Sequence, residues 1–303
     1  MRRSTTATLA IVLITAIWGS TFFIIKDAVA LVDPVDFLAV RFAIGALLPA
    51  ILFWRPISRL TPRQWLIALA LGGVYGLAQI AQTIGLQTTA ASVSGFITGT
   101  YVVITPLIMW AVFRSRLASA MWLAVALAVA GLGILSLNGV MGGGVGELLT
   151  LVGAALYAVH IVLLDRWSRA MDASALATVQ LVGVAIVCGL AGAPGGYQIP
   201  ADSTVWGAIL YTAIAAGIVT MLLQTWAQRH ITPTRVVLLM TLEPVFASVF
   251  AILFGGEFLT ARLLIGGSLI LLATVLGSRS DAVVTHEGAG DNRSPATNET
   301  TSL

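Results

Sequence analysis

The stretch AIWGSTFFIIKD, at residues 16–27, has a counterpart in ALYAVHIVLLDR, at residues 155–166. Both are apolar runs in which an aromatic residue is followed, three positions on, by a polar one. Laying the chain over itself at this offset matches, in order, Trp18 with Tyr157, Thr21 with His160, Arg41 with Gln180, Trp65 with Trp206 and, with small length differences, Pro106 with Pro244. Internal symmetry of this kind predicts two halves that share one fold.

The composition places the chain in a lipid bilayer. Of its 303 residues, 58% are hydrophobic and 10% are charged, and the mean hydropathy is +0.97. Soluble domains carry roughly 25% charged residues, and a helix needs about 20 apolar residues to cross a bilayer. We therefore expect an all-α polytopic membrane protein, with spans at residues 6–26, 35–54, 64–86, 90–113, 117–137, 145–165, 173–193, 204–227, 232–254 and 258–277.

The ten expected spans divide at a glycine-rich connector into two groups of five. The first repeat is expected at residues 1–138, the connector at 139–146, the second repeat at 147–278 and a disordered tail at 279–303. Because five is odd, the second repeat enters the membrane from the opposite side, which gives inverted-topology repeats. The tail is polar and poor in large apolar residues, so it is expected to be disordered.

Basic residues are distributed unequally between the loops. With the N-terminus inside, the outer loops hold only Lys26 and Arg262. The inner segments hold Arg2, Arg3, Arg55, Arg59, Arg63, Arg114, Arg116, Arg166, Arg169, Arg229, Arg235, Arg279 and Arg293. Cytoplasmic loops carry an excess of positive charge, so both termini are expected in the cytoplasm, and the net charge of +3 needs no nucleic-acid partner.

Several motifs are similar to those of a known family. In order they are AIWGSTFFIIKDAV (16–29), VRFAIGALLPAIL (40–52), GLQTTAASVSGFITGTYVVITPL (85–107), ALYAVHIVLLDR (155–166) and LEPVFASVFAILFGGEFL (242–259). Over residues 6–277 the chain resembles the EamA-type transporters of the drug/metabolite transporter superfamily. One departure is FRSRLA, at 113–118, which has Arg116 where the family usually has a glutamate, whereas the second half keeps FGGEFL.

The resemblance implies ten helices in two inverted five-helix bundles, around a central cavity lined by the first, third and fourth helices of each half. It also implies translocation of small metabolites such as amino acids, often outward. The expected function is a secondary transporter of the plasma membrane, without ATP drive, that exports a small metabolite by alternating access. The alternatives are an integral-membrane enzyme acting on lipids and a passive channel or facilitator.

Motifs for other chemistry do not occur in the sequence. It has no HExxH, no Walker A motif, and no metal-ligand cluster among its three histidines. We therefore expect no enzymatic activity, no cofactor and no metal. The expected partners are a small-molecule substrate and the lipid bilayer, with protons as a candidate coupling ion and a homodimer as a candidate assembly.

The stretch LLMTLEPVFAS, at 238–248, sets Glu243 beside Pro244 within an apolar run. A mid-span proline frees a backbone carbonyl, here near Met240, and such backbone is tolerated only against protein or a watery cavity. The carboxylate is expected to face inward or to be protonated. Its role is open between a coupling or cation-binding site and a structural or gating one. Because the family keeps this pair across varied substrates, structure or gating is favoured.

Arg41 lies within the second expected span. Three roles are open: an inward structural hydrogen bond, snorkelling toward the interface, and binding of a substrate carboxylate. We group it with Glu243, Pro244 and Pro106 as a candidate gating or coupling residue.

The remaining polar residues within the spans are candidates for the cavity lining. Some recur at helical spacing, such as Tyr75, Gln79 and Gln82 on the third span. Interhelical hydrogen bonding is the alternative to solute contact for each. The candidates are Trp18, Thr21, Tyr75, Gln79, Gln82, Thr98, Tyr101, Tyr157, His160 and Gln224.

Overall fold

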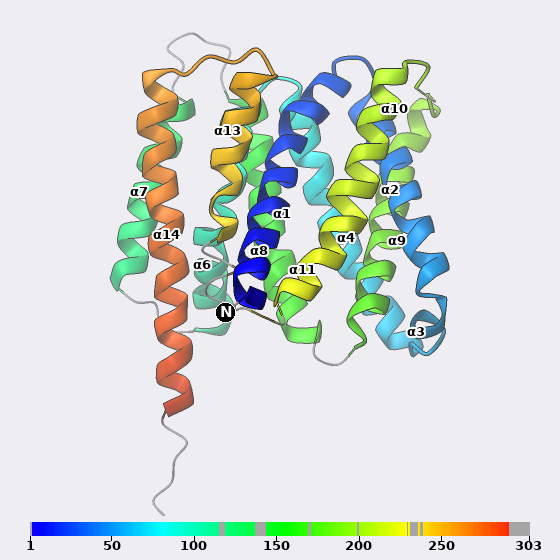
Figure 1. The fold of residues 1–303 in the computed structure, drawn as a ribbon, viewed down its shortest axis with the longest axis horizontal. Coiled ribbons are helices and arrows are strands. Elements are labelled where there is room, and N and C mark those ends of the chain that lie inside the picture. The colour runs from blue at the N-terminus through cyan, green and yellow to red at the C-terminus, as the bar shows by residue number, and fades with distance from the viewer. Residues whose placement is uncertain are drawn as a thin grey trace, which may run out of the picture.

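In a computed structural model the chain forms a bundle of roughly parallel and antiparallel helices (Figure 1). The structure describes residues 2–114, 119–136, 144–168, 171–198, 200–228, 230, 236 and 239–290, and these contain no β-strand. The helices are α1 (Arg2–Ala28), α2 (Pro34–Leu52), α3 (Trp54–Ser58), α4 (Pro62–Leu86), α5 (Ala91–Gly99), α6 (Tyr101–Phe113), α7 (Ser119–Ser136), α8 (Val145–Ser168), α9 (Ala173–Gly192), η1 (Ala193–Gly195), α10 (Ser203–Leu210), η2 (Tyr211–Val219), α11 (Thr220–Gln228), α13 (Glu243–Leu253) and α14 (Ala261–Gly290). The all-helical class predicted from the sequence is confirmed.

Six of the described helical segments are long and apolar enough to cross a membrane. They are Arg3–Ala28, Pro34–Leu52, Pro62–Leu86, Ala91–Val112, Val145–Leu164 and Ala173–Gly195. Four further apolar helices are shorter: Ser119–Leu135, Ser203–Val219, Glu243–Leu253 and Ala261–Gly277. The count of ten spans in two inverted repeats therefore stays a prediction.

Several helices begin where the sequence supplies an N-cap. The side chains of Asp33 and Asp202 accept hydrogen bonds from amides at the starts of α2 and α10, and Thr61 and Gln64 form a capping box on α4. Asp172 caps α9, and hydrogen bonds from the Ser174 side chain and the Ala175 amide lower the pKa of this carboxyl. These N-caps define the residues at which α2, α4, α9 and α10 begin.

The predicted spans at 90–113 and 204–227 are both interrupted. The span predicted at 90–113 is made of α5 and α6, which meet at Thr100. The span predicted at 204–227 passes from α10 into the π-helix η2 and then into α11. A π-helix is rare and often marks a functional site, because its wider turn changes which backbone groups pair.

The C-terminal helix is longer than the sequence predicts. The described helix α14 continues to Gly290, into the segment for which disorder is expected from residue 279, and residues 291–303 lie outside the described part. The segment directly after Ser278 has no proline or glycine before Gly288, so nothing in it stops the helix. Figure 1 shows the N-terminal end of α1 and the C-terminal end of α14 at the same end of the bundle.

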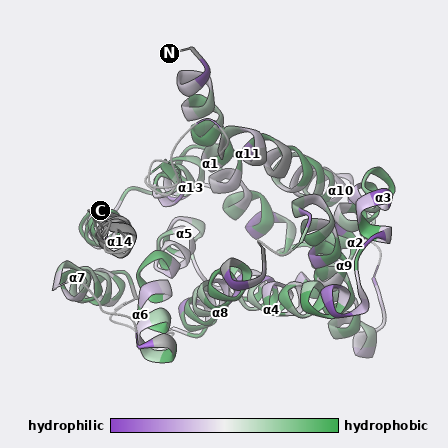
Figure 2. Ribbon diagram, turned by 90° about the horizontal axis from the view of Figure 1, so that it is seen from below, coloured by the Kyte–Doolittle hydropathy of each residue, from purple (hydrophilic) through white to green (hydrophobic). Residues whose placement is uncertain are grey.

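Helices of the N-terminal part of the chain pack against helices of the C-terminal part. Helix α2 packs against α9, and α7 packs against α14. Helix α1 packs against η2 and α11, and α4 packs against α8. Figure 2, viewed along the bundle, shows α7 and α14 as a pair beside the other helices, which are arranged around a common centre.

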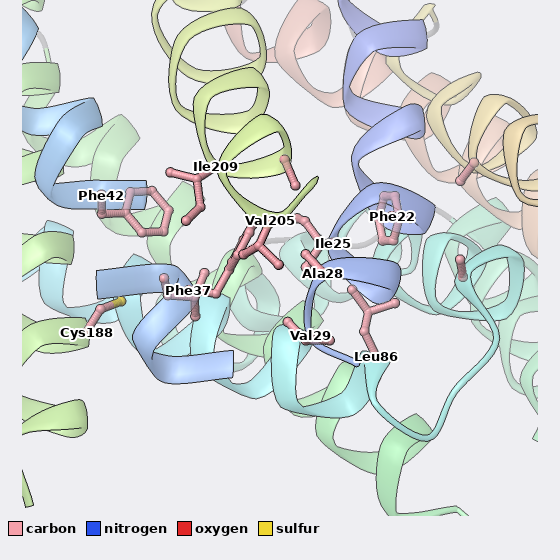
Figure 3. Packing of buried hydrophobic residues seen from close by; sticks show 14 of the residues in the cluster. Phe22, Ile25, Ala28, Val29, Phe37, Phe42, Leu86, Cys188, Val205 and Ile209 are labelled. Carbon is pink, nitrogen blue, oxygen red and sulfur yellow. The ribbon is translucent and has the colours of Figure 1, made fainter. Parts of the chain in front are cut away.

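A buried apolar core joins both parts of the chain. Phe22 and Ile25 of α1, Phe37 of α2, Cys188 of α9 and Ile209 of α10 belong to one cluster of buried side chains (Figure 3). Cys188 is a free thiol in this core, and it acts there as a small apolar residue. The outside of the bundle exposes large apolar side chains such as Leu9, Leu66 and Leu190, as expected where the solvent is lipid.

Candidate functional site

Helix α4 presents a stripe of polar side chains toward α8 and α2. The Gln79 side-chain amide donates to the Tyr75 hydroxyl at 3.2 Å, and Arg41 Nη1 of α2 donates to Gln79 Oε1 at 3.5 Å. The rings of Tyr75 and Tyr157, the latter on α8, lie 5.4 Å apart between centroids. Tyr75 and Gln79 lie about one turn apart on α4, so their contacts place polar side chains of α2, α4 and α8 close to one another.

A second chain of hydrogen bonds crosses from α8 to α5 through α4. The Tyr157 hydroxyl donates to Gln82 Oε1 at 2.8 Å, and Gln82 Nε2 donates to Thr98 Oγ1 at 2.8 Å. Thr98 and Tyr157 are buried, and Gln82 is half-buried. These residues come from three helices distant in sequence, so the bonds fix the helices relative to one another.

His160 lies one turn beyond Tyr157 on α8. Its imidazole centroid is 5.2 Å from that of Tyr75, and its Nε2 is 2.7 Å from Gln180 Oε1 on α9. Sequence reasoning did not propose Gln180 as a site residue. The signal was present, because Gln180 is the repeat counterpart of Arg41.

Trp18 joins α1 to the π-helix η2 by a hydrogen bond. Its indole Nε1 donates to the Ala216 carbonyl at 2.9 Å and approaches Thr220 Oγ1 at 3.2 Å. Two residues further along α1, the hydroxyls of Ser20 and Tyr211 are 2.8 Å apart. Thr21 is half-buried, and its hydroxyl donates to the Trp18 carbonyl at 2.7 Å, so this side chain bonds within its own helix.

The sequence predicted that Pro244 interrupts the middle of a helix, and the structure corrects this expectation. Helix α13 begins at Glu243, so Pro244 lies in its first turn, where a missing amide costs nothing. Pro244 packs closely against α5, because a Cβ added at Gly99 would lie 2.9 Å from its ring. The break lies before the proline, at the turn formed by Thr241 and Leu242.

Glu243 is half-buried and stands at the N-terminus of α13. Its carboxylate makes no hydrogen bond to any other residue that the structure describes. It acts electrostatically on the hydroxyls of Tyr75, Tyr101 and Tyr157. Glu243 therefore lies near tyrosines of three helices, α4, α6 and α8.

Three of the predicted site residues take no part in the hydrogen bonds that α4 makes with α2, α5 and α8. Tyr101 is half-buried at the start of α6, and its contact with the group is the electrostatic one with Glu243 and Tyr75. Gln224 is half-buried on α11 and makes no side-chain hydrogen bond to a described residue. Pro106 is buried inside α6.

Two charged residues at the end of the bundle away from the N-terminus were not predicted as functional. Lys26 Nζ donates to the Thr89 carbonyl at 2.5 Å, and the Glu257 carboxylate accepts from the Ala91 amide at 2.5 Å and from the Ser92 hydroxyl. Together they hold the loop between α4 and α5. The family-like FGGEFL motif was the only sequence signal for Glu257, and its counterpart Arg116 lies outside the described residues.

Known proteins resemble this chain over most of its length. A model of the EamA-like transporter family matches residues 5–137 and, again, residues 144–279. An uncharacterized transporter of Archaeoglobus fulgidus is 32% identical over 274 residues, which cover 90% of this chain and 85% of that protein. The uncharacterized inner membrane transporter YedA of Escherichia coli (strain K12) is 28% identical over 269 residues, covering 86% of each chain.

One protein of known crystal structure shares the fold. It superposes with a TM-score of 0.65 at 18% sequence identity, over 92% of this chain and 99% of the other. At that identity the likeness concerns the fold alone. The two family matches, together with the Archaeoglobus relative, establish the family. The chain belongs to the EamA-like transporter family, within the drug/metabolite transporter superfamily, and is a membrane transporter.

Proposed function

We propose that the chain is a secondary transporter that exports a small metabolite, such as an amino acid or a related compound, across the plasma membrane by alternating access. The observation that supports the proposal is a cluster of polar side chains in the interior of the bundle. Tyr75, Gln79 and Gln82 come from one half of the chain, and Tyr157 and His160 come from the other. Polar side chains are costly inside a membrane, and a solute path explains their concentration at one place.

The inverted repeats are part of the same proposal. Trp18, on the first helix of one half, donates to the third helix of the other half, and Tyr157 does the same in the opposite sense. The packing of α2 on α9 and of α7 on α14 pairs equivalent helices. The two family matches, at 5–137 and 144–279, support a division into two repeats at the connector. We place both termini in the cytoplasm because of the arginine-rich loops.

Alternating access requires that water reach the polar group from at least one side. We therefore expect a cysteine at Thr21 or His160, in a Cys188→Ala background, to react with a membrane-impermeant thiol reagent. Leu264→Cys, at an exposed apolar position of α14, is the control for reaction at the lipid face. Reaction at both interior positions no faster than at Leu264 would contradict a solute cavity there.

Metabolite export in cells tests the function itself. Cells that express the chain should release one metabolite, or a few related ones, faster than cells with an empty vector. The Gln79→Leu/Gln82→Leu variant removes the polar face of α4 and should abolish the difference at equal membrane abundance. Arg55→Gln, at an exposed residue of α3, should match the wild type. Identical release from wild-type and vector cells, across conditions that raise different metabolites, would contradict an exporter.

A further inference from the structure

Arg41 is a buried cation that forms no ion pair with any residue in the described part of the chain. Its side chain is 8% exposed. Among the described residues its side chain makes one hydrogen bond, 3.5 Å long, to Gln79 Oε1, and its Nε has no hydrogen-bond partner there. No carboxylate of the described residues forms an ion pair with it. Asp36, the acidic residue nearest to it along α2, accepts from the Gln198 amide instead.

Lys26 shows by contrast how this fold satisfies a structural cation. Its ammonium group is half-buried and reaches two backbone carbonyls, those of Leu86 and Thr89. Arg41 is more deeply buried than Lys26 and makes fewer hydrogen bonds to the described residues. A buried charge is costly unless it is paired and fully hydrogen-bonded, so a purely structural Arg41 would be expected to have better partners. This difference points to a partner that comes from outside the chain.

Aromatic side chains lie close to Arg41. Its guanidinium carbon lies 4.8 Å from the centre of the Phe42 ring. It acts electrostatically on Tyr75 and Tyr157, the pair whose rings lie 5.4 Å apart. Glu243 acts on the same two tyrosines from α13, yet no ion pair joins it to Arg41. Arg41 and Glu243 therefore both lie near this pair of tyrosines, and among the described residues no ion pair joins them.

We propose that Arg41 binds the carboxylate group of the transported solute, whose remaining body lies against the Tyr75–Tyr157 pair. The inference rests on the proposed transport function. The free Nε and a terminal nitrogen form one edge of a planar guanidinium, and that edge matches the two oxygens of a carboxylate. A single cation also matches the single negative charge of a carboxylate.

Binding is tested first on the purified protein, without transport. Thermal unfolding in detergent is measured with propionate, succinate, phenylacetate and L-leucine, and with the amide of each acid. At least one carboxylate should raise the melting temperature of the wild type, while its amide does not. Arg41→Gln should remove that rise, and Arg55→Gln should keep it. If no carboxylate raises the melting temperature more than its amide, the inference is overturned.

Transport from liposomes separates the inference from the function on which it rests. For the solute that binds, Arg41→Gln should slow release of the carboxylate at least tenfold and leave that of the amide unchanged. Arg41→Lys should fall between, because an ammonium group cannot form the paired contact. Equal losses for acid and amide would mean a structural role and would overturn the inference. Release that is limited to solutes without a carboxylate would also overturn the inference, although the proposed transport function would then stand.

A charge pair formed with Glu243 in another conformation is the main competing explanation. In that case Arg41→Gln would leave Glu243 uncompensated, and the double variant Arg41→Gln/Glu243→Gln would recover release of the carboxylate. That recovery overturns the inference, and continued loss in the double variant supports it. If carboxylates bind through Arg41 but none is released by the wild type, the binding site stands and the proposed function fails.

Discussion

Trp18 and Tyr157 occupy matched positions in the two halves, and each donates a side-chain hydrogen bond to the opposite half. Trp18 bonds to the Ala216 carbonyl at 2.9 Å, and Tyr157 bonds to Gln82 at 2.8 Å. The relationship is reciprocal, as a two-fold arrangement of repeats requires. These hydrogen bonds join α1 to η2 and α8 to α4.

The Tyr157 hydroxyl should contribute a measurable coupling to Gln82. Interhelical hydrogen bonds in membranes contribute about 0.6 kcal/mol on average. Tyr157→Phe should therefore lower the free energy of unfolding by about 0.6–1.7 kcal/mol, and a double-mutant cycle with Gln82→Leu should give a coupling of that order. A cycle of Tyr157→Phe with Trp110→Phe is the control and should give none. Equal values in the two cycles would contradict the hydrogen bond.

Gly19 should be required for the contact between α1 and α13. A Cβ added there would lie 2.6 Å from Phe246 Cβ and 2.8 Å from the Ala247 amide nitrogen. Gly19→Ala should therefore destabilise the protein by about 1–3 kcal/mol through overpacking. Gly45→Ala is the matched control, because nothing lies within 4 Å of its added Cβ. That variant should be neutral or more stable by up to about 1 kcal/mol, and equal losses of thermal stability would contradict the packing.

Glu257 should stabilise the start of α5. Its carboxylate accepts hydrogen bonds from the Ala91 and Ser92 amides, and α5 has no side-chain cap of its own. Glu257→Ala should reduce stability by about 1–2 kcal/mol, the range of a lost N-cap with its charge. Asp27→Asn, at an exposed acidic residue near the same end, should change it by less than about 0.5 kcal/mol. A neutral Glu257→Ala variant, measured by thermal unfolding, would contradict the cap.

Much of the fold follows from local sequence, and much of the site does not. Apolar runs predict the helices, and Asp33, Asp172 and Asp202 mark where three of them begin. Hydropathy averages over a whole span, so it cannot detect the π-helix at Tyr211–Val219 or the helix start at Glu243. Those features depend on which backbone groups pair.

The partners of the predicted polar residues were also beyond the sequence. The stripe of Tyr75, Gln79 and Gln82 was visible as helical spacing, but its bonds to Arg41 and Tyr157 are set by tertiary packing. The contact of Glu257 with α5 likewise joins residues far apart in the chain. Matching Gln180 to Arg41 across the repeat was the signal that came nearest to predicting such a contact.

The Glu243→Gln variant distinguishes a coupling role of this residue from a structural one. Because its carboxylate lacks a hydrogen bond to the described residues, Glu243→Gln should leave the melting temperature unchanged. If Glu243 carries a coupling proton, accumulation of the solute in proteoliposomes should lose its dependence on an imposed pH gradient in this variant, because the amide cannot ionise, while exchange continues. Asp27→Asn is the control and should keep the dependence. A Glu243→Gln variant that retains the wild-type dependence would exclude the coupling role.

Selective release from proteoliposomes tests the transport function most directly. Liposomes are loaded with a defined mixture of amino acids, organic acids, amines and sugars, diluted, and assayed over time by mass spectrometry for what they retain. We predict that liposomes with the wild-type protein lose one solute, or one related group, faster than protein-free liposomes. The Gln79→Leu/Gln82→Leu variant should remove this difference. Retention of every solute as in protein-free liposomes, or unselective loss of all of them, would contradict a secondary transporter.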